Sequence, residues 1–219
     1  MRLPTIKIHE PTKEVTYNLG ELETPDYSLD LSNRDKVIKR IEKIVRSSIE
    51  YKELISFLKE EMDFSHCIFL TNVDYDIAAL NFHHDPIRLY DVCDIILNKH
   101  EKLYEDVSIF KVAEEVMLVH YKGMIPLIPI TFTIHQLVHS DSLFIPIQII
   151  NQSAFGDYKL FCRKYKNYMS DDYKRAIKEY ISLSNEVIED YQVPILDRKF
   201  TYIHCDDFVL PKRIEREDD

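Results

Sequence analysis

The apolar positions between residues 33 and 62 recur with the spacing of an α-helix. They return every three or four residues, which places them on one face. Ser32 and Asp35 precede most of this run with a spacing similar to that of a capping box, in which the second residue is usually Glu or Gln. The pattern predicts one long helix or two shorter ones. Its apolar face consists of Val37, Ile38, Ile41, Ile44, Val45, Ile49, Leu54, Ile55 and Leu58.

The pattern changes at Asp63 to that of strands. Two short apolar runs, 67–71 and 77–82, flank the turn-rich sequence Asn-Val-Asp-Tyr-Asp, which predicts a β-hairpin. This hairpin would end on two adjacent histidines, His83 and His84. Because successive strand residues point to opposite faces, the two imidazoles are expected to face different surroundings.

The rest of the chain alternates helical and extended patterns. Two prolines interrupt the apolar run 124–131, which excludes a helix and predicts an extended loop on the core. Residues 1–31 favour a hairpin or arm, and a frayed tail is expected from Lys212. The remaining predicted elements are helices at 90–100, at 108–123 with Gly123 as its stop, at 133–140 and at 157–190 (two, separated near 169–172), and strands at 143–150 and 198–210.

Charge and glycine content exclude some classes of function. The net charge of −10 argues against a protein that holds nucleic acid by overall electrostatics, so any such contact must be local. The three glycines, Gly20, Gly123 and Gly156, leave no glycine-rich loop for phosphates, and no nucleotide cofactor is expected.

The chain also lacks the sequence signals of a membrane or secreted protein. No apolar run approaches the 18 residues or so of a membrane span, and the N-terminus lacks the apolar core of a signal peptide. We therefore expect a cytoplasmic protein without a membrane partner. The four cysteines form no Cys-x-x-Cys pair and are interpreted as isolated thiols, namely Cys67, Cys93, Cys162 and Cys205.

Two histidines in the predicted helix 133–140 have the spacing of metal ligands. His135 and His139 are separated by four residues, so their imidazoles project from one face about one turn apart. Two ligands do not make a site, and the end of the strand with His83 and His84 is the expected source of a third. Taken alone, two adjacent histidines at the end of a strand are more often incidental polar residues than functional ones; it is their combination with the spacing of His135 and His139 that favours a metal site.

The sequences Phe-His-His-Asp-Pro-Ile and His-Gln-Leu-Val-His resemble the HNH, or ββα-metal, nuclease superfamily, especially its colicin-type DNases and bacteriophage proteins. The resemblance implies an α+β fold, mostly helical, around a ββα-metal core. It implies that His83, His135 and His139 bind one divalent metal ion (Zn, Mg or Mn) and that His84 is the general base for hydrolysis of DNA. Three histidines and a water suit Zn²⁺, whereas Mg²⁺ prefers oxygen ligands.

The chain departs from the family pattern at two places. Pro126 stands where the family has an Asn, and His84 and His135 are 51 residues apart, which implies a helical insertion at about 86–123. The expected regions are an N-terminal arm and helix at 1–62, the HNH-like core at 63–145, and C-terminal helices and a strand at 146–219.

Several other residues have two interpretations. Asp85 orients His84 or holds the turn before Pro86, and His120 is a core histidine or a support for the site. His66 and His100 are expected at the surface. A basic run from Lys36 to Arg46 is offset by acids and is interpreted as solvated.

A second basic cluster has aromatic residues interleaved with it. It either binds nucleic acid, with base stacking on Tyr158, Phe161, Tyr165, Tyr168 and Tyr173, or forms an amphipathic helix whose aromatic side chains pack inward. Its candidate contacts are Lys159, Arg163, Lys164, Lys166, Lys174 and Arg175.

The sequence leaves three functions open. The first is a metal-dependent endonuclease acting on DNA. The second is a catalytically degenerate HNH-scaffold protein that acts in binding, regulation or assembly, with a protein partner or a second copy of the chain. The third is a domain that a metal ion stabilises without hydrolytic activity.

Overall fold

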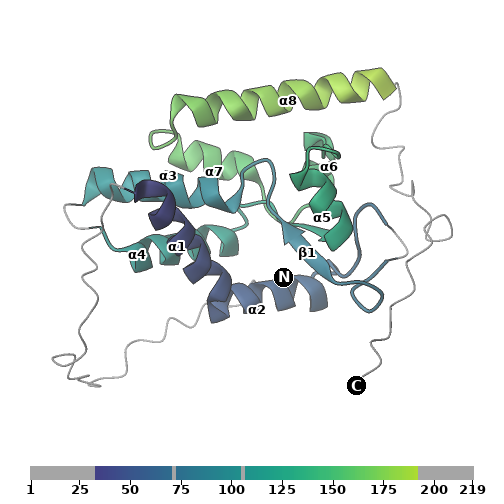
Figure 1. Ribbon diagram of the computed structural model, residues 1–219, viewed down its shortest axis with the longest axis horizontal. Helices are drawn as coiled ribbons and strands as arrows, with labels where there is room; N and C mark the ends of the chain where they lie inside the picture. The colour runs from purple at the N-terminus through teal and green to yellow at the C-terminus, as the bar shows by residue number, and fades with distance from the viewer. Residues whose placement is uncertain (1–32, 71–72, 105–106, 192–219) are drawn as a thin grey trace, which may run out of the picture.

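The computed structural model of the chain describes residues 33–70, 73–104 and 107–191 (Figure 1). Five sequence expectations lie outside these residues: the N-terminal hairpin, the Ser32 cap, the strand at 198–210, the thiol of Cys205 and the frayed tail from Lys212.

The first helical pattern forms two helices, which decides between the two alternatives. Helix α1 (Arg34–Ser47) begins at Asn33, whose side chain accepts a hydrogen bond from the Lys36 N–H. Ser48 leaves helical geometry, with φ −64° and ψ 151°, and its hydroxyl accepts the Tyr51 N–H at the start of α2 (Ile49–Glu60). A serine in this position ends one helix and caps the next.

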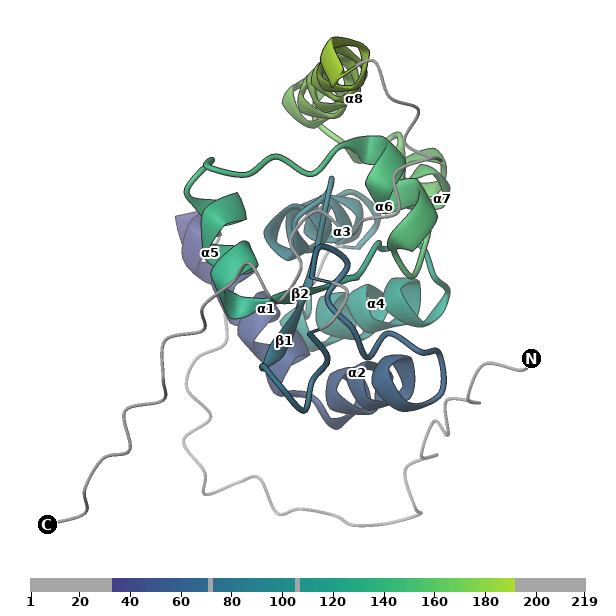
Figure 2. The same ribbon diagram turned by 90° about the vertical axis from the view of Figure 1, so that its right-hand side faces the viewer.

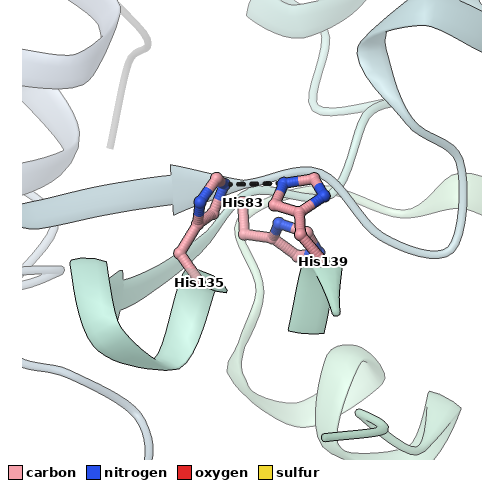
Figure 3. A group of neighbouring side chains, drawn as sticks. All are labelled: His83, His135 and His139. Carbon is pink, nitrogen blue, oxygen red and sulfur yellow. Dashed lines mark hydrogen bonds between the residues drawn. The ribbon is translucent and has the colours of Figure 1, made fainter. Parts of the chain in front are cut away.

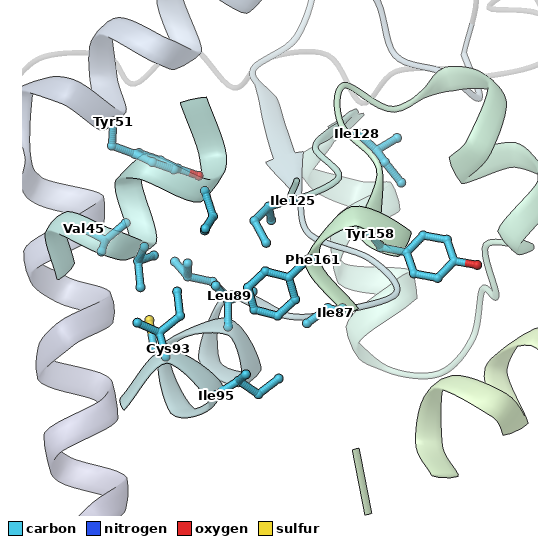
Figure 4. Packing of buried hydrophobic residues seen from close by; sticks show 14 of the residues in the cluster. Val45, Tyr51, Ile87, Leu89, Cys93, Ile95, Ile125, Ile128, Tyr158 and Phe161 are labelled. Atoms are coloured by element: carbon cyan, nitrogen blue, oxygen red, sulfur yellow. The ribbon is translucent and has the colours of Figure 1, made fainter. Parts of the chain in front are cut away.

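Helices α1, α3 (Leu89–Leu103) and α4 (Ile109–Tyr121) pack on one another, and α7 (Tyr158–Tyr165) packs on α3. The predictions of helices at 90–100 and 108–123 are confirmed. Gly123 follows α4 at φ +60°, a conformation that glycine adopts without steric cost, so its predicted role as the stop is also confirmed. Figure 4 shows the core between these elements, with Leu89, Ile125 and Phe161 close together.

The sheet differs from the predicted hairpin. Strand β1 (Leu80–His83) pairs antiparallel with β2 (Ile128–Thr131), with Phe82 opposite Pro129. Residues 67–70 form no strand of the sheet, so the prediction of a local hairpin was wrong. Part of the segment 124–131, which was expected to be a loop, is strand β2.

Pro129 is compatible with this sheet because of the way its carbonyl points. Its C=O accepts the N–H of Ile68, on the side away from β1. The N and C=O of one strand residue point to the same side, so the missing N–H of Pro129 removes no hydrogen bond between β1 and β2.

Helix α5 (Phe132–His139) follows β2 directly. The Thr131 hydroxyl accepts the Ile134 N–H and caps the helix, which then packs against both strands. Figure 2 shows α5 and α4 on opposite sides of the strands. The sheet therefore separates α5 from the helix that carries His120.

The strand expected at 143–150 is wrong, because α6 (Ile147–Ser153) occupies much of it. Pro146 precedes this helix at φ −60°, and its carbonyl accepts the N–H groups of Ile149 and Ile150. The N–H of Ile147, which has no partner within α6, donates to the buried hydroxyl of Ser184 on α8 (Asp171–Tyr191). A proline with helical φ and a tertiary cap therefore outweigh the strand preference of the isoleucines.

Helix α8 lies along one side of the molecule, and residues 166–170 separate it from α7 (Figure 1), which agrees with the two helices expected at 157–190. Tyr173 of α8 donates to Asp94 of α3, which also receives the Arg34 guanidinium at 2.6 Å. The described residues are mostly helical with one two-stranded antiparallel sheet, so the coarse α+β class is confirmed.

Candidate histidine site

Three histidines from two distant segments meet beside the sheet. His83 ends β1, and His135 and His139 lie one turn apart on α5. Because α5 packs directly on β1, the ring of His83 lies 5.2 Å from that of His135 and 5.5 Å from that of His139, measured between centroids. Figure 3 shows the three imidazoles turned toward one another.

The nitrogen positions fit a single cation. The Nε2 atoms of His135 and His139 are 3.2 Å apart, and one nitrogen from each of the three rings lies within 4.8 Å of the others. Bonds of about 2.0 to 2.1 Å at a tetrahedral angle place two ligand nitrogens about 3.3 Å apart. One pair thus already has the spacing of zinc ligands, and His83 needs to approach by at most about 1.5 Å.

The protonation of the α5 histidines also suits a cation. Burial, followed by the charges of His139 and His83, lowers the pKa of His135 to about 4. Burial and His83 lower the pKa of His139 as well. Both rings are therefore neutral at pH 7, which is the form of imidazole that binds metal.

Asp85 lies beside His83. Its Oδ2 atom is 3.6 Å from His83 Nε2 and accepts a hydrogen bond of 2.8 Å from the hydroxyl of Tyr180 on α8. A carboxylate next to a ligand histidine is a common means of orienting the ring. Asp85 contacts His83 and Tyr180 in the described chain, and no hydrogen bond joins it to His84; its predicted role in orienting His84 stays a prediction.

His84, the residue after His83, contacts His120 of the inserted helix α4. Their Nε2 atoms are 3.1 Å apart, and His120 Nδ1 lies 2.7 Å from the carbonyl oxygen of Val116. Tyr51 of α2 stacks on the His84 ring, with 12° between the planes, and meets the His120 ring edge-on. His120 is thus both a core residue, fully buried, and a neighbour of the site.

The buried pair is neutral at pH 7. Burial, then the charges of His120 and Arg46, place the pKa of His84 well below its usual value. Burial lowers the pKa of His120 to about 4, against the opposing effect of its hydrogen bond to Val116.

A cleft of about 500 Å³ joins these groups. His83, His84, His135 and His139 all line it, as do two arginines that the sequence did not indicate. Arg46 comes from α1, and Arg88 precedes α3. Arg46 was interpreted as part of a solvated run, and no periodicity marks it as different; Arg88 is four residues after His84, and that proximity was the available signal.

Other sequence expectations fall away from the cleft. Pro126 is buried in the segment before β2 and does not line it. His66 is exposed, as expected, whereas His100 is buried and lies 2.9 Å from Glu115, so the surface expectation for His100 was wrong.

The six basic residues proposed for nucleic-acid binding lie on or next to α7 and α8, and none of them lines the cleft. Lys174 and Arg175 pair with Asp171 and Asp172 on their own helix. The aromatic residues of α7 are buried, which agrees with the amphipathic alternative. Binding of nucleic acid by this cluster stays a prediction.

A comparison with protein families gives a match over most of the chain. The model of the bacteriophage G278-like virion protein family matches residues 7–209. The chain belongs to this family. Membership of the G278-like virion proteins confirms the expected association with bacteriophages. No curated protein and no solved structure matches the chain.

The family description names a component of the virion, and a location in the host cytoplasm stays a prediction for this G278-like protein. Among the residues described, no helix combines the length and the apolar character needed to cross a bilayer.

His120 gives this G278-like protein an expected sensitivity to acid. Its pKa is about 6.5 in the unfolded chain and about 4 in the folded one, so the unfolded chain takes up a proton first as the pH falls. The stability that neutral His120 retains above pH 6.5 is lost toward pH 4, by about 3 kcal/mol. Urea unfolding in EDTA measures the free energy of unfolding at pH 7 and at pH 4. Between these two values, His120→Gln should lose about 3 kcal/mol less stability than wild type. Equal losses in the two proteins would contradict the assignment of the low pKa to His120.

Proposed function

We propose that this virion protein is a metal-dependent endonuclease that hydrolyses phosphodiester bonds of DNA. One observation carries the proposal: nitrogen atoms of His83, His135 and His139 lie close enough together to share one cation, and His84, the residue after His83, lines the same cleft. Metal-assisted hydrolysis with a general base requires a bound cation and a nearby group that can accept a proton, and an uncharged imidazole is such a group.

The order of elements supports a ββα-metal core. Strand β1 carries the histidine pair at its end, β2 pairs with it, and α5 follows β2 immediately with the other two histidines. The helices α3 and α4 lie between the two strands in the chain, where the insertion at about 86–123 was expected. This order supports the resemblance to HNH nucleases noted in the sequence.

The donor set favours a transition metal. Three imidazoles suit Zn²⁺, with one tetrahedral position left for a ligand, whereas Mg²⁺ prefers oxygen atoms. When bound, the cation would supply Lewis-acid stabilisation of negative charge on the phosphate.

The cleft residues provide the remaining roles. Arg46 and Arg88 give it local positive charge, which an anionic phosphodiester needs in a chain of net charge −10. His84 takes a proton from the attacking water, because its ring is neutral at pH 7 and lines the cleft. Its low pKa makes it a weaker base than a free imidazole, which favours a modest rate at neutral pH.

The test is nicking of supercoiled plasmid by untagged protein with Zn²⁺, Mn²⁺ or Mg²⁺. We expect metal-dependent conversion to open-circular DNA, inhibited by EDTA and lost in His135→Ala. The exposed His66, outside the cleft, provides the control variant His66→Ala, which should match wild type. Wild-type protein that nicks no DNA with any of the three metals contradicts the proposal, as does a His135→Ala variant with wild-type activity.

The family description favours a second candidate, an assembly protein of the virion that retains the scaffold without catalysis. Its net charge of −10 and the exposed apolar side chains of Phe110 and Phe132 are compatible with a protein partner. If the protein acts in assembly alone, the His84→Ala variant should be incorporated into phage particles as efficiently as wild type. The wild-type protein should then show no nuclease activity.

A further inference from the structure

We infer that His120 is a positioning residue for His84: it accepts the proton on His84 Nε2 in a hydrogen bond and leaves His84 Nδ1 as the nitrogen that faces the cleft. His120 belongs to the inserted helix α4. The catalytic role of His120 rests on the proposed endonuclease function, but the arrangement of protons does not.

The carbonyl oxygen of Val116 fixes the direction of both hydrogen bonds, the one between Val116 and His120 and the one between His120 and His84. The carbonyl oxygen of Val116 can only accept, so the nitrogen 2.7 Å from it, His120 Nδ1, carries a proton. A neutral imidazole carries one proton, so His120 Nε2 holds a lone pair. The contact of 3.1 Å between the two Nε2 atoms is then a hydrogen bond only if His84 donates it.

The neutrality of His120 has a structural basis. Its ring is fully buried, and its described contacts are His84, Tyr51 and the Val116 carbonyl, none of which is a carboxylate. Arg46, whose charge acts on it, opposes a second positive charge. A charged imidazolium in these surroundings is strongly disfavoured.

The other nitrogen of His84 is the one left for the cleft. Its Nδ1 atom has no hydrogen-bond partner among the described residues. Among the described residues, Gln148 Oε1 is the one side-chain nitrogen or oxygen that is both buried and without a hydrogen-bond partner. His84 Nδ1 also lacks a partner, so it must retain some exposure to solvent. Since His84 forms part of the cleft wall, we infer that this exposure is to the cleft.

Tyr51 holds the pair in this orientation. Its ring lies nearly parallel to that of His84 and nearly perpendicular to that of His120, at centroid distances of 6.4 and 5.9 Å. A 180° flip of the His84 ring would move Nε2 away from His120 and leave a buried acceptor unpaired, which costs about 1 to 3 kcal/mol. The ring is therefore fixed both by packing and by hydrogen bonding.

The decisive measurement is the tautomer of each ring, read from two-bond ¹H–¹⁵N correlations of the full-length protein in EDTA at pH 7.5. Signals are assigned by their loss in His84→Gln and His120→Gln. We expect a protonated Nε2 and bare Nδ1 for His84, and the opposite for His120. A protonated His84 Nδ1, or averaged signals from tautomers in exchange, overturns the inference.

A second arm tests the consequence for catalysis. His120→Leu removes the acceptor, whereas His120→Gln retains one in its amide oxygen. We expect a cleavage rate about 10- to 100-fold lower for His120→Leu, with recovery in His120→Gln. Equal rates for His120→Leu and wild type overturn the positioning role. Wild-type protein without nuclease activity contradicts the proposed function instead, and the tautomer measurement still decides the arrangement of protons.

Discussion

His84→Ala should lower the rate of DNA cleavage by about 10²- to 10⁴-fold, the contribution of a positioned general base. The reason is that the variant removes the uncharged nitrogen from the cleft and leaves the three proposed ligands, His83, His135 and His139, in place. The measurement is a single-turnover rate on supercoiled plasmid, with enzyme in excess, at saturating metal.

Two controls separate chemistry from folding in this experiment. The His66→Ala variant removes an exposed histidine outside the cleft and should retain the wild-type rate. Thermal unfolding followed by circular dichroism should show His84→Ala folded at the assay temperature, because truncation of one buried ring leaves most of the core intact. A folded His84→Ala variant that cleaves at the wild-type rate would exclude His84 as the base.

Zinc should stabilise the wild-type protein, and loss of one ligand should remove most of that effect. At a free zinc concentration 100 times the dissociation constant, binding to the folded state alone contributes about 2.7 kcal/mol. His139→Ala should weaken zinc binding by at least about 100-fold. Mutation of a residue that only hydrogen-bonds to a metal ligand already lowers metal affinity by about 10- to 100-fold, and loss of a ligand itself should lower it further. Titration calorimetry on untagged protein measures the affinity, and thermal unfolding with and without EDTA measures the stabilisation.

His139 is the best position for this test because it is exposed, so its truncation leaves no cavity in the core. In EDTA, His139→Ala and wild type should therefore unfold at nearly the same temperature, and only the zinc-bound proteins should differ. Equal zinc affinity of wild type and His139→Ala would show that zinc binds elsewhere on the chain.

Local patterns were enough to predict the helices and part of the site. The apolar spacing of 33–62, 90–100 and 108–123 gave helices, and the spacing of His135 and His139 placed both on one face of a helix. These features depend on neighbours within one or two turns. The proximity of His83 to that pair was expected from the family resemblance, and the geometry agrees with it.

Features that depend on tertiary packing were missed or left open. The partner of β1 is more than 40 residues away, and the turn-rich sequence nearby suggested a local hairpin instead. The prolines in 124–131 concealed a strand, because their compatibility depends on which way Pro129 faces. The contact of His120 with His84 requires α4 to lie next to the residue that follows β1, which no single segment specifies.

The separation of β1 and β2 by α3 and α4 has a consequence for the order of folding. Closing a long loop costs more configurational entropy than closing a two-residue turn, so these strands do not form a nucleus by themselves. Packing of α3 on α4 shortens the effective loop and brings the ends of the two strands together. We therefore expect His83, His135 and His139 to meet only after the helices have assembled, so that metal binding at the proposed site would report the last stage of assembly rather than the first.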